Sequence, residues 1–251
     1  MKKWITLFIA TLFPHIVWAA DVQANLQWSQ RVELSTSVSG NILVVHVDAG
    51  DLVKKGQVLL SLDGAAYQAQ VDESRSEITR LTAEADEDKR ELDRVLELHE
   101  RTIVATTELD QAKLKLIRSQ SALSEAQARL RRNQKALSDT SIRAPFDAVV
   151  ILRQAEPGQS VAAGLQPQTL LTLARSGEMI ARMHLPSSQL DQLKSGQPLP
   201  LTVGSANYTG KIKTLGMEPV KIKEEWLYPV DVLFSVKEKL RAGTPALVKI
   251  P

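Results

Sequence analysis

Hydrophobic residues recur with a heptad period in the middle of the chain. Leucine returns every seven residues and alternates with small or polar residues at Leu109, Ala112, Leu116, Ser119, Leu123, Ala126, Leu130, Asn133 and Leu137. Steps of three and four residues place these side chains on one stripe of an α-helix, which predicts a narrow coiled-coil seam. Small residues at every second seam position allow a partner helix to approach closely.

A less regular apolar stripe precedes this helix and predicts its partner. Its members are Val71, Ile78, Leu81, Ala85, Leu92 and Val95. Asp88 falls on the same stripe and weakens it, and we expect it to face water with its acidic neighbours Asp86 and Glu87. Residues 65–144 contain neither glycine nor proline, which is typical of long helix.

Residues 102–107 interrupt the helical pattern, because five of these six are β-branched. Either Thr106 or Thr107 is expected to cap the second helix. We therefore predict an antiparallel hairpin over residues 65–139, with arms of about 50 Å. One continuous helix is the alternative, which the break disfavours.

The segments on either side of the predicted hairpin repeat each other. Gly50-x-x-Val53-x-x-Gly56 precedes it and Gly158-x-x-Val161-x-x-Gly164 follows it, and each half then ends in a short apolar strand. Such a repeat indicates two copies of one supersecondary unit. We expect residues 32–64 and 140–174 to pair into one small β-domain, with the four glycines in tight turns that need positive φ.

A third pattern begins after Ala174. Short alternating segments with turn signals between them occupy residues 179–185, 198–203, 208–215, 228–236 and 246–250. They predict a small antiparallel β-barrel over residues 175–251. The expected fold class is mostly β, with a long α-helical coiled-coil hairpin inserted into a split domain.

The first 19 residues have the organisation of a secretory signal peptide. Two lysines are followed by the apolar run of residues 5–13 and then by a cleavage site after Ala19, with Val17 and Ala19 at the usual recognition positions. Cleavage there removes two of the 31 basic residues and leaves 29 of each sign, so the charge gives no argument for nucleic acid. An uncleaved anchor is the alternative, but a spanning helix needs about 20 apolar residues.

The composition excludes several kinds of chemistry. The chain has no cysteine, which rules out disulfides, thiolate zinc sites and cysteine nucleophiles. Gly-x-Ser-x-Gly and His-Glu-x-x-His are both missing from the sequence. Met179, Met183, His184 and Met217 are the best soft-metal ligands, but Met179 and Met183 share one face of a predicted strand and are expected to pack in a core. We expect no enzyme, no metal site and no cofactor.

These features together resemble the periplasmic adaptor, or membrane fusion protein, family of bacterial efflux systems, of the RND and HlyD-like type. Residues 38–40 with 50–59 resemble the first half of a lipoyl-like domain, and residues 140–147 with 157–161 resemble the second. The resemblance implies a barrel-sandwich hybrid split by the hairpin. A lipoyl carrier needs a lysine at the junction of the halves, where residues 61–64 supply none.

The resemblance also implies a role and partners. Such adaptors join an inner-membrane transporter to an outer-membrane channel of the TolC type, and export small molecules across the periplasm. An RND transporter is favoured, with an ATP-driven exporter as the alternative, and six copies are expected. A periplasmic ligand-binding or carrier protein is the competing function. The expected location is the periplasm, in peripheral association with the envelope.

Channel-binding adaptors carry at the hairpin tip an arginine, a leucine four residues later and a serine seven beyond that. The matching positions are Arg94, Leu98 and Ala105, and the adjacent Thr106 is a candidate replacement for the serine. Without the resemblance, Arg94 would be read as the partner of Glu91 or Glu97 in an intrahelical ion pair.

Many family members carry a further membrane-proximal β-domain built from both chain ends. Only residues 21–31 precede the lipoyl-like half here, and the predicted barrel runs to Pro251. The resemblance therefore implies a reduced adaptor, in which that domain is absent or a remnant.

Overall fold

The computed structural model describes residues 20–164 and 167–251, so the predicted signal peptide lies outside the described residues. The chain forms two compact units. One comprises residues 31–174, and the other joins the N-terminal segment up to Gln30 to residues 175–251. None of the described helices is both long and apolar enough to cross a membrane.

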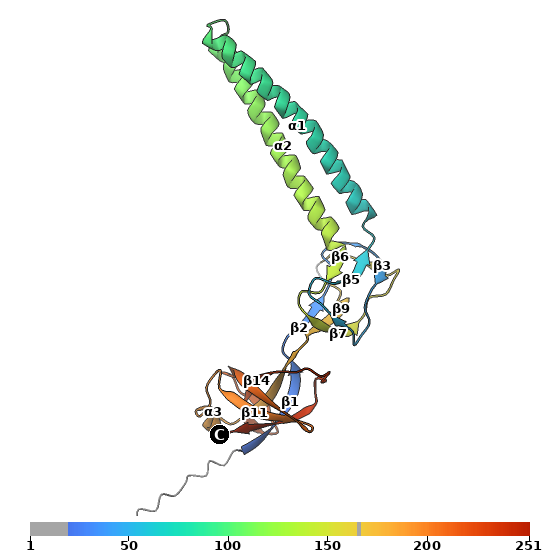
Figure 1. Cartoon of the computed structure of the whole chain (residues 1–251), viewed down its shortest axis with the longest axis vertical. Coiled ribbons are helices and arrows are strands. Elements are labelled where there is room, and N and C mark those ends of the chain that lie inside the picture. Colours follow the sequence, from blue (N-terminus) through green and yellow to red (C-terminus); the bar gives the residue numbers. More distant parts are fainter. Residues whose placement is uncertain (1–19, 165–166) are drawn as a thin grey trace, which may run out of the picture. The chain divides into compact units, whose positions relative to one another are not determined.

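The middle of the chain forms a helical hairpin. α1 (Ala65–Glu100) and α2 (Thr106–Asp139) lie side by side along their length (Figure 1). The β-branched segment separates them, so the continuous helix is excluded. The expected cap by Thr106 or Thr107 is wrong, because Ala105 is the N-cap residue of α2 and no side chain bonds there. The helix is stabilised instead by its packing on α1.

The heptad stripe of α2 faces α1. All nine of its residues are buried or half-buried, from Leu109 to Leu137. The expectation that Asp88 faces water is wrong, because its side chain is 4% exposed and its Oδ1 lies 2.9 Å from Lys115 Nζ. A cation from the partner helix compensates the buried carboxylate. The residue pattern of α1 taken alone does not reveal this compensation.

Two four-stranded sheets form the β-domain from which the hairpin emerges. Their orders are β2-β9-β7-β4 and β6-β5-β3-β8, so each sheet takes strands from both halves of the repeat. The strands are β2 (Arg31–Leu34), β3 (Gly40–Val45), β4 (Leu52–Val53), β5 (Val58–Leu62), β6 (Ser141–Arg143), β7 (Ala148–Arg153), β8 (Ser160–Val161) and β9 (Leu171–Arg175).

The two halves are related by an approximate two-fold symmetry. The Gly50 N–H donates to Val150 O at 2.8 Å, and the equivalent Gly158 N–H donates to Ile42 O at 2.8 Å. The halves therefore exchange strands and share one core, which includes the fully buried Leu59, Leu60, Leu170, Leu171 and Leu173. A half of this size leaves its apolar face exposed unless the other half covers it.

The turn glycines behave as expected at three of four positions. Gly50, Gly56 and Gly158 have φ of +96°, +83° and +84°, a region that favours glycine. Gly164 does not adopt positive φ, so the expectation is wrong there. The repeat preserves the residue type at that position, but the local backbone has a different conformation.

A closed six-stranded barrel forms the second unit. Its order is β10-β1-β15-β11-β12-β14, and β14 pairs again with β10. The elements are β1 (Ala20–Trp28), β10 (Glu178–Leu185), α3 (Ser187–Leu190), β11 (Pro198–Val203), β12 (Ala206–Leu215), β14 (Glu225–Ser235) and β15 (Pro245–Ile250). A further short strand, β13 (Val220–Ile222), pairs with β14.

The N-terminal strand β1 is the main element that the sequence analysis did not predict. It lies between β10 and β15, and without it the barrel would not close. Its residues Ala24 and Leu26 are 3% and 1% exposed. Met179 and Met183 are also buried in this core, which confirms the packing role expected from their spacing.

Candidate functional site

The loop at the hairpin tip has a well-defined backbone. α1 ends at Glu100, and Thr102 takes a left-handed conformation with φ +62°. The Thr102 N–H donates to His99 O at 2.8 Å, and the Ile103 N–H donates to Leu98 O at 3.0 Å. These two bonds form a Schellman motif, which satisfies carbonyls that the end of a helix leaves without partners.

A small apolar cluster supports this loop. Val95 of α1 is buried with Leu109 and Ala112 of α2. Val104 packs on the cluster from the loop, and its carbonyl oxygen lies 3.1 Å from His99 Nδ1. Because both helices and the loop contribute, the cluster holds the tip residues in a fixed position on the end of the hairpin.

The predicted channel-contacting residues surround this loop. Arg94 is exposed and its Nη2 lies 2.7 Å from Glu91 Oε2, so the intrahelical ion pair is present. Leu98 is half-buried one turn further along α1, and Ala105 and Thr106 are exposed where α2 begins. The fold thus brings Leu98, Ala105 and Thr106 to the tip, with Arg94 one turn away. Their contact with a partner stays a prediction.

Ile103 is a tip residue that the sequence analysis treated only as a helix breaker. Its side chain is 64% exposed at the outermost turn. The exposure of Ile103 could have been predicted from the sequence, because an isoleucine in a short loop between two helices does not belong to the apolar stripe of either helix. An exposed apolar side chain on a rigid turn is well suited to contact another protein.

In the middle of the hairpin, an ion pair between Asp88 of α1 and Lys115 of α2 crosses the seam. The hydrogen bond from Lys115 holds the pKa of Asp88 below its usual range, and Ser119 adds to this effect. The same bond raises the pKa of Lys115. Both groups stay charged near neutral pH, so the pair contributes to structure and offers no acid or base for catalysis.

The β-domain has no lysine at the position that a carrier requires. Only Asp63 and Gly64 lie between β5 and α1. In the preceding turn, Lys54 Nζ lies 3.1 Å from Asp147 Oδ2, and the Lys55 N–H donates to Asp147 Oδ1 at 2.9 Å. These lysines therefore fix a turn between the two halves.

The four candidate metal ligands do not gather in one place. Met179 and Met183 point into the barrel core, whereas Met217 is 90% exposed in the loop after β12. His184 is half-buried, and burial lowers its pKa. Within residues 20–164 and 167–251, no three histidine or carboxylate side chains are placed to bind one ion.

A split barrel-sandwich hybrid that carries a helical hairpin and is followed by a β-barrel defines a membrane fusion protein. The chain belongs to this family: residues 30–173 match the family model described as the barrel-sandwich hybrid domain of RND membrane fusion proteins.

Several curated relatives have names that refer to export or resistance. The pyoverdine export membrane fusion protein PvdR of Pseudomonas aeruginosa is 32% identical over 214 residues, which cover 78% of this chain and 55% of that protein. The macrolide export protein MacA of Yersinia pestis is 28% identical over 231 residues, covering 83% and 62%. The chain therefore spans little more than half the length of these relatives.

Solved structures share the fold. A membrane fusion protein of Streptococcus pneumoniae has a TM-score of 0.70 at 15% identity, with coverage of 93% of this chain and 99% of that one. A chimera of MacA with the hairpin of MexA from Pseudomonas aeruginosa has a TM-score of 0.65 at 21% identity, with coverage of 92% and 78%.

Proposed function

We propose that the protein is the periplasmic adaptor of a tripartite efflux pump, which bridges an inner-membrane transporter and a TolC-type outer-membrane channel. The observation that carries the proposal is the hairpin tip. A Schellman turn and an apolar cluster hold exposed residues at the end of two long helices, within a chain that belongs to the membrane fusion protein family.

The proposed contact uses side chains that differ in character. Leu98 and Ile103 supply apolar surface, and Arg94 and Thr106 supply hydrogen-bond donors. The Arg94–Glu91 pair is exposed to solvent and costs little to rearrange, so Arg94 is able to exchange Glu91 for a group on the channel.

The transporter is proposed to be of the RND class, in keeping with the matched family model, and the adaptor to act as a ring of copies in the periplasm. The cargo is proposed to be a small molecule, as in the names of the two export relatives. This role assembles a conduit by protein contacts and requires neither a cofactor nor a catalytic group.

The test is photo-crosslinking in cells from a photoreactive residue at position 98. Position 83, exposed in the middle of α1, is the matched control on the same helix. Mass spectrometry should identify an outer-membrane channel from position 98 and not from position 83. If a folded and abundant protein captures only soluble proteins from position 98, the proposed role is wrong.

The variant Leu98→Asp provides a second test. A charge in a contact that must lose its water should reduce channel capture from a photoreactive residue at 103 by at least about tenfold. Ala83→Asp is the control, because it adds the same charge to an exposed position of α1 far from the tip.

A further inference from the structure

His99 occupies the last seam position of α1 before the tip loop. It follows Leu92 by seven residues and Val95 by four, which is the spacing of the seam, and both of these residues belong to the apolar cluster of the tip. An apolar side chain at this position would extend the cluster. The histidine is half-buried and instead brings two polar ring nitrogens to the end of the seam.

One ring nitrogen of His99 is bound to the loop. Nδ1 lies 3.1 Å from Val104 O, and a carbonyl oxygen can only accept, so the proton of this hydrogen bond is on Nδ1. The carbonyl oxygen of His99 also accepts from the Thr102 N–H at 2.8 Å. The loop therefore sets both the tautomer and the orientation of the imidazole ring.

The other ring nitrogen is available to a partner. An uncharged imidazole that donates from Nδ1 is an acceptor at Nε2. Among the described residues Nε2 has no hydrogen-bond partner, and Ser29 Oγ is the only buried side-chain polar atom of that part of the chain without one. His99 Nε2 is therefore in contact with solvent, and the tip presents it as an acceptor with a fixed direction.

Apolar residues accompany His99 at the tip. Leu98 precedes it in the chain, and the bond from the Ile103 N–H to Leu98 O at 3.0 Å brings the 64% exposed Ile103 back to the last turn of α1. A protein that covers these side chains removes water from this region. An acceptor that loses water without gaining a donor costs free energy, so a well-matched partner supplies an N–H or O–H group.

We propose that His99 determines the specificity of the channel contact, through a hydrogen bond that its Nε2 accepts from an N–H or O–H group of the outer-membrane channel. This inference rests on the proposed function and adds the chemistry that the channel presents. That chemistry is a donor aligned with Nε2, beside an apolar surface that receives Leu98 and Ile103. A channel with an acceptor at the same position is rejected, because two lone pairs would then face each other.

A purely structural role for His99 is the alternative, in which the ring only ties the loop to α1 through Nδ1. Two substitutions separate the roles. In His99→Asn the amide N–H replaces the Nδ1 donor, and no atom remains at the position of Nε2. In His99→Gln the longer side chain brings an amide oxygen to the position of Nε2, and the Nδ1 donor is lost.

The experiment measures channel capture by both variants from a photoreactive residue at position 103 of the full chain, in cells of its own host. Recognition through Nε2 predicts that His99→Asn reduces capture by at least about fivefold and that His99→Gln reduces it less. The structural role predicts the opposite order. His46→Asn changes an exposed histidine of the β-domain and should alter capture by less than about twofold. The proposal is overturned if His99→Gln captures no more channel than His99→Asn.

A second measurement does not depend on the channel. Nitrogen NMR of the purified protein, labelled with ¹⁵N at histidine, should show His99 protonated at Nδ1 and unprotonated at Nε2 at about pH 8. The signal is assigned by its loss in His99→Asn, and the opposite tautomer would overturn the proposal whatever the captures show.

A parallel probe at position 98 separates this proposal from the proposed function. If position 98 of a folded and abundant wild-type protein captures no channel, the proposed function fails and the role of His99 fails with it. If position 98 captures the channel but His99→Gln is no better than His99→Asn, only the role of His99 is wrong.

Discussion

Asp88 of α1 and Lys115 of α2 form an ion pair across the hairpin seam, with Asp88 Oδ1 2.9 Å from Lys115 Nζ. The Asp88 side chain is 4% exposed, and Lys115, which is 64% exposed, reaches it from the helix surface. Ser119, buried on the α2 seam, also lowers the pKa of Asp88, while its hydroxyl donates to Leu116 O at 3.0 Å. The apolar stripe of α1 therefore contains one buried charge. Lys115 can neutralise it only when α2 packs on α1 in the correct register.

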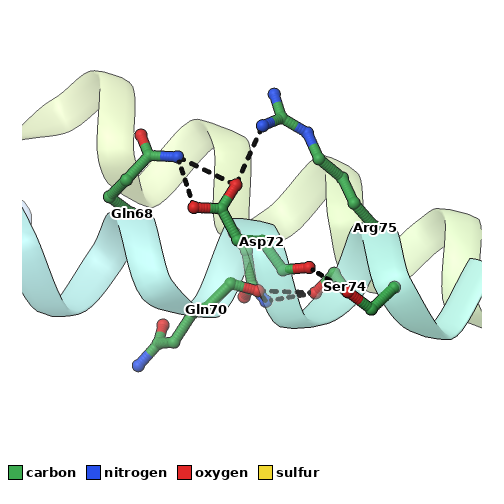
Figure 2. Close-up of polar contacts among 7 residues, drawn as sticks. Gln68, Gln70, Asp72, Ser74 and Arg75 are labelled. Carbon is green, nitrogen blue, oxygen red and sulfur yellow. Dashed lines mark hydrogen bonds and ion pairs between the residues drawn. The ribbon is translucent and has the colours of Figure 1, made fainter.

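A second polar contact lies two heptads away along the same seam. Asn133 Nδ2 donates to Ser74 Oγ at 2.8 Å and to Gln70 O at 3.2 Å, and Figure 2 shows Ser74 and Gln70 on α1. Asp88 lies as far from Ser74 on α1 as Ser119 lies from Asn133 on α2. Both polar contacts thus form in one register, and a slip by one heptad would break both.

Removing Lys115 should destabilise the hairpin more than removing an ordinary surface lysine. Lys115→Ala leaves the Asp88 carboxylate buried without a cation, which is costly. Lys113→Ala is the control, because Lys113 makes only a surface pair with Asp110 at 3.6 Å. Thermal unfolding should show a lower midpoint for Lys115→Ala alone. Equal midpoints in the two variants would show that the buried pair has no special role.

The Asn133–Ser74 contact should show measurable coupling in a double-mutant cycle. Each residue is changed to alanine singly and together, and the free energy of unfolding is measured in urea by helical circular dichroism. A neutral hydrogen bond in a seam contributes about 1 kcal/mol, so the coupling should be near that value. Strictly additive effects would mean that the contact does not help to set the register.

Thr102→Gly should stabilise the hairpin tip. Thr102 is β-branched and has φ +62°, a conformation that costs roughly 1–2 kcal/mol for a side chain with a Cβ. Glycine loses more entropy on folding, so the net gain in unfolding free energy should be about 0.5–1 kcal/mol. Thr82→Gly in the middle of α1 is the control and should lower stability. A loss at both positions would contradict the strain argument.

The barrel contains an ion pair between a buried aspartate and a half-buried arginine. Arg182 Nε and Nη2 donate to the two oxygens of Asp231 at 2.7 and 2.8 Å, from the adjacent strands β10 and β14. Arg182→Leu should cost roughly 2 kcal/mol of unfolding free energy, because Asp231 is left buried and Arg182 itself is partly screened by water. The double variant Arg182→Leu with Asp231→Leu should recover much of that loss. Failure to recover it would point to lost packing instead.

His184 should make the barrel less stable in mild acid. Burial lowers the pKa of His184, and the positive Arg182 beside it lowers it further, against a smaller opposing effect from Asp231. The unfolded chain therefore binds a proton first, so stability is lost as the pH falls below about 6.5. His184→Gln should flatten the dependence of the unfolding midpoint between about pH 8 and pH 5. An unchanged slope would show that other groups cause it.

The sequence indicated the hairpin and its break because both are local patterns. Seven-residue recurrence of leucine specifies a helix face, and a β-branched run specifies a poor helix, so α1 and α2 end close to where they were expected. The burial of Asp88 was not foreseen, since the cation that compensates it comes from another helix.

Strand partners were harder to predict than strands. Apolar and polar side chains alternate only weakly over residues 20–28. This segment forms β1 because it pairs with β10 on one side and with β15 on the other. β13 has three residues and depends on the hairpin with β14. Short strands gain their stability from cross-strand contacts, which single-sequence patterns do not contain.

The sequence by itself determined the helical hairpin, the two related halves of the β-domain and the seam residues of α2, because each follows from the spacing of residues along the chain. The tertiary structure alone decided which seam residues pair and that β1 closes the barrel. These features depend on groups that are distant in sequence, and the balance between burial and solvation is settled only when those groups meet.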